Sequence, residues 1–239
     1  MTLTQGVAVK LLTVGNPKIL KGNAFGYFTA ILHFAPARLS GFNVCPMASK
    51  ACTAACLNTA GRGGIFRKGE TTNRIQIARK ARTLFYFNET EKFMTQLAKE
   101  IGNVVKLAAK HGLKPAIRLN GTSDIRWENE KVNGVRNIME MFPNVIFYDY
   151  SKISNRRNLP PNYSLTFSLS EDNDELAERA LVNGMNVAAV FRKIPSTFLG
   201  RPVVDGDKSD LRFLDPKGVI VGLKAKGKAK KDSTGFVRN

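Results

Sequence analysis

The stretch NETEKFMTQLAKEIGNVVKLAAKHGLKPAIRLNGTSD, residues 88–124, decides the fold class of this chain. Asn88 is placed to cap a helix, with Glu91 three residues later. Apolar residues then recur at helical spacing, at Phe93, Leu97, Ile101, Val104, Val105 and Ala108. Gly112 stops this helix, and Lys114–Leu119 has the pattern of a short strand. A helix that leads directly into a strand is typical of an α/β protein.

The same alternation continues on both sides of this stretch. Helical spacing predicts further helices over residues 71–87, 130–142 and 172–183. Strands are expected over residues 7–14, 24–34, 145–150, 163–169, 186–191, 203–204 and 218–223. Strands separated by helices predict βα units with mainly parallel strands. We therefore expect one α/β domain over residues 1–223, followed by a segment of different composition.

The charge of the chain is strongly positive. Lys and Arg number 37 against 19 Asp and Glu, which gives a formal net charge of +18. A polyanion is the natural partner, nucleic acid first and an anionic membrane surface second, and the remaining explanation is solubility alone. No apolar run approaches the ~20 residues of a membrane span, and residues 1–12 lack a secretion signal. We expect a cytoplasmic protein with a nucleic-acid partner and no membrane association.

Two regions concentrate the positive charge. Between residues 62 and 82, seven cations face Glu70 alone, and a phosphate track is predicted at Arg67, Arg74, Arg79 and Arg82. A solvated helix face is the alternative for this region. Residues 224–239 have a net charge of +5 and are expected to form a basic, flexible tail that also contacts phosphates. Its lysines are Lys224, Lys226, Lys228, Lys230 and Lys231.

The three cysteines of the chain, Cys45, Cys52 and Cys56, lie in the segment CPMASKACTAAC. Such clustering in a reducing compartment indicates metal binding rather than disulfides. A loop with these spacings suits a [4Fe-4S] cluster, and three thiolates would leave one iron open. Nearby cations, Lys50, Arg62, Arg67 and Lys68, would favour the thiolate form. Zinc held by these cysteines and His33 is the main alternative, and idle cysteines are the other.

Polar residues follow two of the predicted strands. Asn120, Ser123 and Asp124 come after the strand at residues 114–119 and are candidates to bind a cofactor, with a polar turn as the alternative. Lys152 follows the next strand, as an anion contact, as a general acid or as a solvated surface lysine. The glycines at 61–64 lack the Gly-Lys-Ser/Thr ending of a P-loop, and no nucleophile elbow is present. ATP hydrolysis and triad hydrolysis therefore have no support.

The order Phe25-Gly26, Cys45-Pro46-x-Ala48, Cys52, Cys56-Leu57 and Gly61 resembles the phage "gene product 88" family. More distantly the chain resembles phage radical-SAM-like iron–sulfur proteins related to spore photoproduct lyase. The resemblance implies a partial (β/α) barrel with an N-terminal cysteine-bearing loop. It also implies a [4Fe-4S] cluster near the carboxyl ends of the strands and S-adenosylmethionine at the open iron.

These observations lead to one expected function and two alternatives. The expected function is that of a phage-type, radical-SAM-like iron–sulfur protein that acts on or near nucleic acid, in the host cytoplasm. The first alternative is a non-enzymatic nucleic-acid-binding protein with a structural zinc or iron–sulfur site. The second is an accessory protein that binds an acidic host partner. The sequence leaves the substrate and the oligomeric state open.

Overall fold

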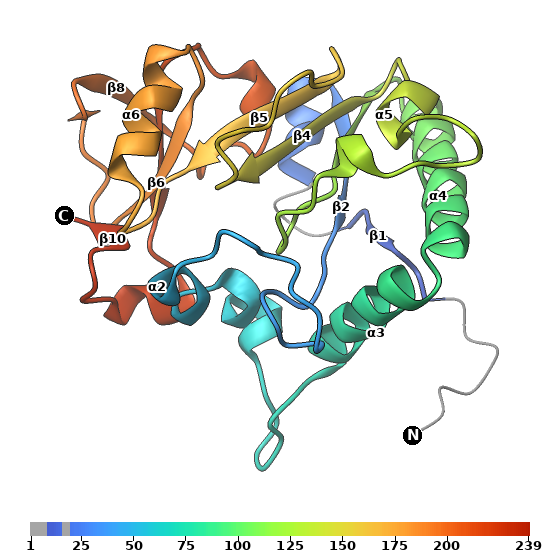
Figure 1. Ribbon diagram of the computed structural model, residues 1–239, viewed down its shortest axis with the longest axis horizontal. Helices are drawn as coiled ribbons and strands as arrows, with labels where there is room; N and C mark the ends of the chain where they lie inside the picture. Colours follow the sequence, from blue (N-terminus) through green and yellow to red (C-terminus); the bar gives the residue numbers. More distant parts are fainter. Residues whose placement is uncertain (1–8, 16–19) are drawn as a thin grey trace.

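The computed structural model describes residues 9–15 and 20–239. Within these residues one ten-stranded sheet runs through the molecule in the order β1-β2-β3-β4-β5-β6-β9-β8-β7, and β10 pairs with β6 (Figure 1). The strands are β1 (Leu12–Thr13), β2 (Tyr27–Leu32), β3 (Lys114–Arg118), β4 (Ile146–Ser151), β5 (Tyr163–Ser168), β6 (Val187–Phe191), β7 (Thr197–Phe198), β8 (Arg201–Asp205), β9 (Ile220–Lys224) and β10 (Val237–Arg238).

Most neighbours in this sheet are parallel. Every pair from β2 through β6 and β9 to β8 is parallel, and only the edge pairs β1–β2 and β7–β8 are antiparallel. The predicted α/β class with mainly parallel strands is therefore confirmed. The sheet keeps two separate edges, at β1 and β7, so the described strands do not close into a barrel.

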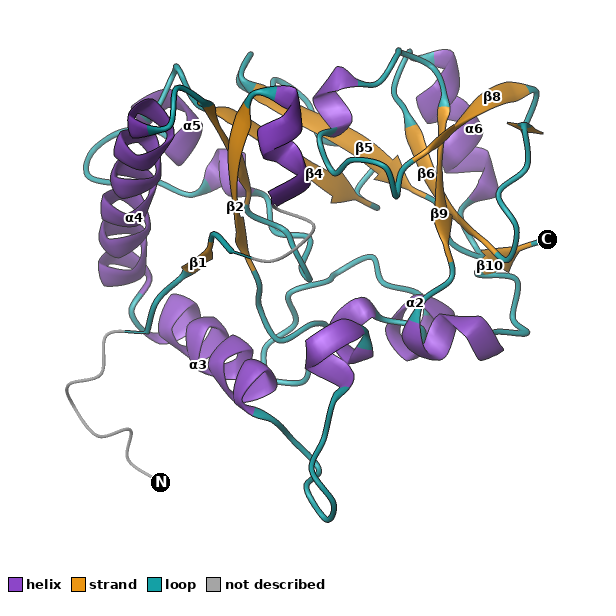
Figure 2. Ribbon diagram, turned by 180° about the vertical axis from the view of Figure 1, so that it is seen from behind, coloured by secondary structure: helices purple, strands orange, loops and turns teal. Residues whose placement is uncertain are grey.

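The helices are α2 (Lys50–Ala54), α3 (Arg74–Asn88), α4 (Thr90–Lys110), α5 (Ile138–Met141) and α6 (Asp174–Val182) (Figure 2). The apolar side of α4 packs in one cluster with Leu32, Ile117 and Phe147 of the central strands. The short helix α6 covers β5 and β6 with Ala177 and Leu181. No described helix combines the length and the apolar character that a membrane span requires.

An irregular segment that includes Leu211 and Phe213 packs on those side chains of the same strands that do not face α4. Leu211 packs with Ala116 and Tyr148, whereas the neighbouring Phe147 belongs to the α4 cluster. The ring of Phe213 contacts Tyr27 and Tyr148 edge-on, at centroid distances of 5.0 and 5.4 Å. Side chains alternate along a strand, so this segment and α4 cover opposite faces of the sheet.

Several predicted boundaries are wrong, for local reasons. The expected helix over residues 130–142 is confined to Ile138–Met141, because Asn133 and Gly134 have positive φ angles of 46° and 80° and form a turn between Val132 and Val135. Asn88 does not cap α4. It is the last residue of α3, and Glu89 precedes α4 without a side-chain cap.

The two predicted N-terminal strands are shorter than expected. In the first, only Leu12–Thr13 is a strand, and residues 7 and 8 of that prediction lie outside the described part of the chain. The second begins at Tyr27, because Lys21–Phe25 form a 3-10 helix. The other predicted strands are present within two residues of their expected bounds.

The segment after β9, predicted to be a flexible tail, is folded onto the domain. Gly227–Lys231 form a 3-10 helix, and β10 pairs in parallel with β6. Ala229 and Val237 are only 3% and 5% exposed, and they pack with Ala55 of the cysteine segment. The segment packs on the domain rather than lying apart from it as expected, because the buried cluster of Ala55, Ala229 and Val237 and one strand pairing hold it in place.

Candidate metal centre

The cysteine segment, residues 35–73, connects β2 to α3 and contains short helices rather than a plain loop. Ser49 caps α2: its Oγ accepts a hydrogen bond from the Cys52 backbone N–H at 3.0 Å. Cys52 therefore lies in the first turn of α2, and Cys56 follows two residues after its end. The 3-10 helices Leu57–Thr59 and Gly61–Gly64 complete the segment.

Residues far away in sequence fix this segment. The Glu171 carboxylate, after β5, accepts hydrogen bonds from Ser49 Oγ at 2.8 Å and from the Ala51 N–H at 3.2 Å. A carboxylate at the start of a helix is favourable for the helix dipole. On the other side, Ala55 packs with Ala229 and Val237. The positions of Cys52 and Cys56 thus depend on the C-terminal third of the chain.

Cys45 is held against the loop that follows β3. Its Sγ accepts a hydrogen bond from the Ala37 N–H at 3.4 Å and donates one to the Thr122 carbonyl at 3.7 Å. The Asp124 N–H donates to the Val44 carbonyl at 2.7 Å, which joins the two backbones beside the cysteine. The three cysteines are therefore positioned by three different parts of the fold.

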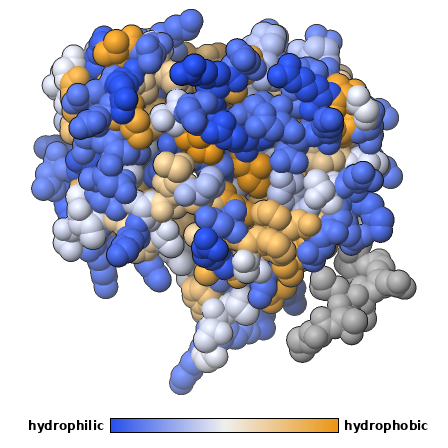
Figure 3. All heavy atoms as spheres, in the orientation of Figure 1, coloured by the Kyte–Doolittle hydropathy of each residue, from blue (hydrophilic) through white to orange (hydrophobic). Residues whose placement is uncertain are grey.

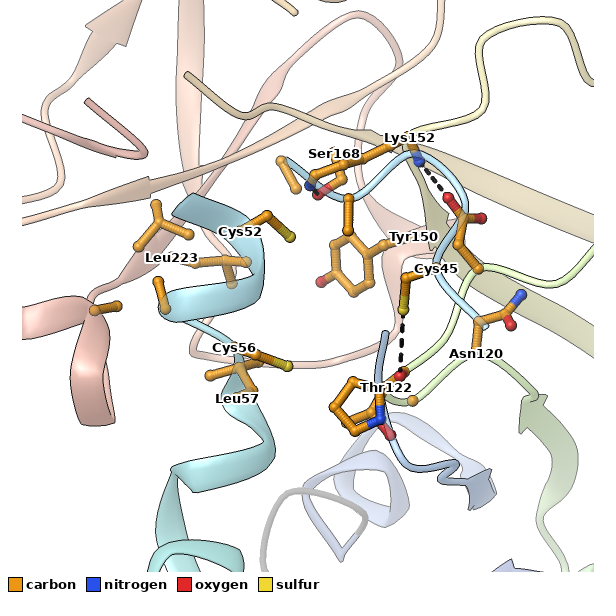
Figure 4. Close-up of a pocket in the computed structure, with 18 of the residues that line it drawn as sticks. Cys45, Cys52, Cys56, Leu57, Asn120, Thr122, Tyr150, Lys152, Ser168 and Leu223 are labelled. Carbon is orange, nitrogen blue, oxygen red and sulfur yellow. Dashed lines mark hydrogen bonds between the residues drawn. The ribbon is translucent and has the colours of Figure 1, made fainter. Parts of the chain in front are cut away.

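All three cysteines line one cavity of about 220 Å³, far larger than the ~10–15 Å³ that one water needs. Figure 4 shows the three sulfurs pointing into this cavity from the cysteine segment. The opposite wall comes from strand ends and includes Arg118, Tyr150, Lys152, Ser168, Val190 and Leu223. In open α/β sheets the carboxyl ends of the strands are where ligands bind.

The possible ligand atoms near the cavity bear on the choice between an iron–sulfur cluster and a zinc ion. The three cysteines are free of disulfides. Among the described residues, no three His, Cys, Asp or Glu side chains lie within reach of one metal ion. His33, the proposed fourth zinc ligand, does not line the cavity. Its burial, together with Arg79, Arg118 and Arg82, lowers its pKa to about 3.

Burial dominates the acidity of the three thiols. It raises the pKa of Cys45 to about 12 and raises the pKa values of Cys52 and Cys56 above their ordinary value. The cations that oppose these pKa shifts are Lys152 at both Cys52 and Cys56 and Arg79 at Cys56, whereas the sequence pointed to Lys50, Arg62, Arg67 and Lys68. The metal-free thiols are thus neutral, and binding of a metal would release protons.

Lys152 is a buried polar side chain of the cavity. The expectation of a solvated surface lysine is wrong, because Lys152 is only 8% exposed and lines the cavity. Its Nζ donates to Ser168 Oγ at 2.8 Å and lies 5.8 Å from the centre of the Phe236 ring. Its position after β4, on the same face as Tyr150, was the signal that could have found it.

Asn120, Ser123 and Asp124, which are predicted to bind a cofactor, lie in the cavity wall. Their side chains form hydrogen bonds with other groups of the protein. Asn120 Oδ1 accepts from Ser123 Oγ, from the Ile125 N–H and from Trp127 Nε1. The Asp124 carboxylate accepts from Ser151 Oγ and the Lys152 N–H, both at 2.8 Å. These bonds shape the loop after β3, and a direct contact of these residues with a cofactor stays a prediction.

A buried charge network includes residues of the cavity wall and the residues behind it. Arg118 forms an ion pair with Asp210 at 3.2 Å and stacks over the Tyr150 ring at 4.6 Å. The Asp149 carboxylate accepts hydrogen bonds from the Asn120 N–H at 2.7 Å and from Tyr163 Oη at 2.9 Å. Burial raises the pKa of Asp149 to about 7, although Arg118 and these hydrogen bonds act in the opposite direction.

The predicted phosphate track is divided by the fold. Arg67 and Arg74 are exposed, as are the five lysines from Lys224 to Lys231. Arg79 is 9% exposed, and its guanidinium donates to Asn58 Oδ1 at 2.6 Å. Arg82 is half-buried and donates to the Lys10 carbonyl at 2.7 Å. Arg79 and Arg82 therefore hold the cysteine segment and the N-terminal strand rather than forming a free cationic surface.

The fold and cavity define an α/β protein with a three-cysteine pocket at the carboxyl edge of a mostly parallel sheet. The chain belongs to the gene product 88 family, whose family model matches residues 8–239. This match confirms the resemblance to the phage family that the cysteine segment indicated. Searches of curated proteins and of solved structures find no match. The comparisons give no support to the more distant radical-SAM likeness.

Proposed function

We propose that Cys45, Cys52 and Cys56 hold a [4Fe-4S] cluster in the cavity and leave one iron without a cysteine ligand. The observation that carries this proposal is the convergence of the three thiols, from a capped helix and its two flanks, on one cavity. Thiolates are the ordinary protein ligands of such clusters. The remaining donors around the cavity are not thiols, so Cys45, Cys52 and Cys56 would be its only thiolate ligands.

The arrangement favours a cluster over a single zinc ion. A structural zinc takes four ligands at about 2.0–2.3 Å from one point, which requires the donor atoms to lie close together. The three cysteines instead point into the cavity from separate places (Figure 4). A cluster places each thiolate on a different iron and so suits donors that surround a space. His33, the best fourth ligand for zinc, lies outside the cavity lining.

Residues of the strand ends supply the surroundings that such a group needs. Lys152 places a buried positive charge beside Cys52, where it stabilises the thiolate. The side chains of Val190, Leu223 and Phe236 give the cavity an apolar wall. When bound, the cluster supplies one-electron transfer and an open coordination position. S-adenosylmethionine, the cofactor that the resemblance implies, is the ligand we propose for that position.

We also propose that the protein acts on or near nucleic acid. The net charge of +18 supports this part of the proposal, because polyanion binding is the usual use of such an excess. A non-enzymatic nucleic-acid-binding protein with a structural cluster is the second candidate. Reduction of the loaded protein in the presence of S-adenosylmethionine separates them: formation of 5′-deoxyadenosine supports the enzyme, and an unchanged cofactor supports the structural cluster.

The metal is tested by anaerobic purification and assay of iron and sulfide. We expect about four irons and four sulfides per chain, with broad visible absorption. Cys52→Ser should lose both, whereas Lys50→Ala, an exposed neighbour in the same helix, should keep them. Thermal unfolding of both variants controls for folding. A colourless wild-type protein with one tightly bound zinc would overturn the proposal.

A further inference from the structure

Exposed apolar side chains gather in the cysteine segment and the helix that follows it. Within the described residues, eight of the thirteen large apolar side chains that are exposed lie between positions 39 and 87. They are Leu39, Phe42, Met47, Leu57, Ile65, Phe66, Ile77 and Phe87. Figure 3 shows hydrophobic atoms gathered on the lower part of this face, bordered by hydrophilic residues. A concentration of exposed apolar groups in one region marks an interaction surface.

Two of these side chains form an exposed ring pair. Phe42, in the cysteine segment, stacks on Phe87 near the end of α3, with centroids 4.3 Å apart and ring planes 6° apart. Their exposed fractions are 36% and 37%. A parallel aromatic pair that stays open to solvent offers flat faces on which a planar group can stack.

A third aromatic side chain lies on a projecting arm, residues 65–73, which hangs below the body of the molecule in Figures 1 and 2. Asn73 closes the base of the arm: its Nδ2 donates to the Gly63 and Ile65 carbonyls, both at 3.0 Å. The Glu70 N–H donates to the Arg67 carbonyl at 3.0 Å and closes the tip. Phe66, Arg67 and Lys68 are thus presented on an anchored loop, all exposed.

The segment that carries these rings is rich in cations, and the exposed Glu89 just after it forms an ion pair with Lys92. Residues 35–88 contain nine Lys and Arg against the single acid Glu70. Arg79 is buried and so is not part of the exposed charge. Arg82 is half-buried and donates a hydrogen bond to the Lys10 carbonyl. The seven that remain exposed are Arg38, Lys50, Arg62, Arg67, Lys68, Arg74 and Lys80. The surface therefore combines exposed aromatic rings with cations, which complements an anionic chain that carries planar groups.

We propose that this surface binds single-stranded nucleic acid, with Phe42, Phe87 and Phe66 stacking on unpaired bases. Arg67, Lys68 and Arg74 would contact the phosphates. In a duplex the bases are stacked on one another, so exposed rings gain nothing from it, whereas base–aromatic stacking is a main source of affinity for single strands. This inference rests on the nucleic-acid part of the proposed function and is independent of the metal.

The test is fluorescence anisotropy with a labelled oligo-dT of about 16 nucleotides and with a duplex of the same length. Wild-type protein should bind the single strand more tightly than the duplex. The double variant F42A/F87A should bind the single strand about 10-fold or more weakly, with an unchanged salt slope. The matched control is Phe25→Ala, which removes a ring that is 50% exposed in the 3-10 helix before β2 and should change nothing.

The charged residues give a second readout. The double variant R67Q/K68Q should weaken binding of both strands and reduce the salt slope by about one to two units. If F42A/F87A does not fold, as judged by thermal unfolding, Phe66→Ala on the arm replaces it. Wild-type affinity of the ring variants, or equal binding of duplex and single strand, would overturn the single-strand inference alone. Binding of poly-glutamate but of neither nucleic acid would overturn the nucleic-acid part of the proposed function as well.

Discussion

Residues 62–82, which include the arm, and residues 224–239 are similar in composition but differ in how they are placed. Each has many cations and a single acid, Glu70 in one and Asp232 in the other. The arm projects from the body, whereas residues 224–239 form one wall of the cavity through Lys226, Ala229 and Phe236. Charge therefore does not decide where such a segment lies. The two segments differ in whether their apolar residues are buried against the domain.

The C-terminal segment is held by small but well-placed contacts. Ala229 and Val237 are buried against Ala55, and β10 adds backbone hydrogen bonds to β6. Arg238 donates to the Ser170 carbonyl at 2.7 Å and to the Asp174 carboxylate at 2.8 Å. In the arm, Ile65 and Phe66 are 67% and 39% exposed. The first region is thus expected to support the cavity and the second to contact a partner.

Removing each region in turn should give the largest differences in iron loading, stability and single-strand binding. Deletion of residues 224–239 removes the wall that packs on Ala55, so we expect loss of iron loading and a fall of about 3 kcal/mol or more in the free energy of unfolding. Replacement of residues 66–69 by two glycines should leave iron loading and stability nearly unchanged and weaken single-strand binding. Iron assay and urea unfolding of both variants measure iron loading and the free energy of unfolding. Equal iron loading in the two variants would contradict the assigned roles.

A single substitution sharpens the same contrast. Ala229→Asp places a charge where 3% of the side chain is exposed, and we expect a loss of about 3 kcal/mol in the free energy of unfolding, together with impaired iron loading. Lys230→Asp, at an exposed neighbouring position, should cost less than about 0.5 kcal/mol. Similar losses for the two variants would show that the segment is not packed on the domain.

Asn73 both caps α3 and closes the base of the arm, and different substitutions can test the two functions separately. Asn73 Oδ1 caps α3 by accepting from the Ile75 and Gln76 N–H groups, while Nδ2 closes the arm. Asn73→Ala should lower the free energy of unfolding by about 1 kcal/mol. Asn73→Asp retains the cap but cannot donate to the two carbonyls, so it should be more stable than Asn73→Ala and still bind single strands less well than wild type. Urea unfolding and anisotropy measure the two effects.

The buried Asp149 makes a smaller, pH-dependent contribution. Because burial raises its pKa to about 7, the folded protein binds a proton that the unfolded chain has already released at neutral pH. Its contribution to stability is therefore full below about pH 4 and is lost as the pH rises to about 7. In the Asp149→Asn variant, the decrease in the free energy of unfolding over this pH range should be smaller. The difference between the two urea-unfolding series across this range is the measurement, and parallel curves would refute the assignment.

The sequence predicted the sheet well because its central strands are continuous apolar or alternating runs, such as Val187–Phe191. Three thiols within twelve residues also indicated a shared site, and the three cysteines do line one cavity, while their role as metal ligands stays a prediction. The turn at Asn133-Gly134 carries a local Asn-Gly signal, but the helical spacing of residues 130–142 predicted a helix through it. The burial of Lys152 and Arg79 and the docking of the C-terminal segment depend on contacts between distant segments, which no local pattern contains.

The central claim is that three cysteines hold a four-iron cluster with one iron that has no cysteine ligand. Mössbauer spectroscopy of the anaerobically loaded, full-length protein tests it most directly, with S-adenosylmethionine added as the probe. We predict four irons per chain, of which about three keep their parameters and one changes when the probe is added. An absence of iron, a single bound zinc, or four irons that do not distinguish one site in the presence of the probe would contradict it.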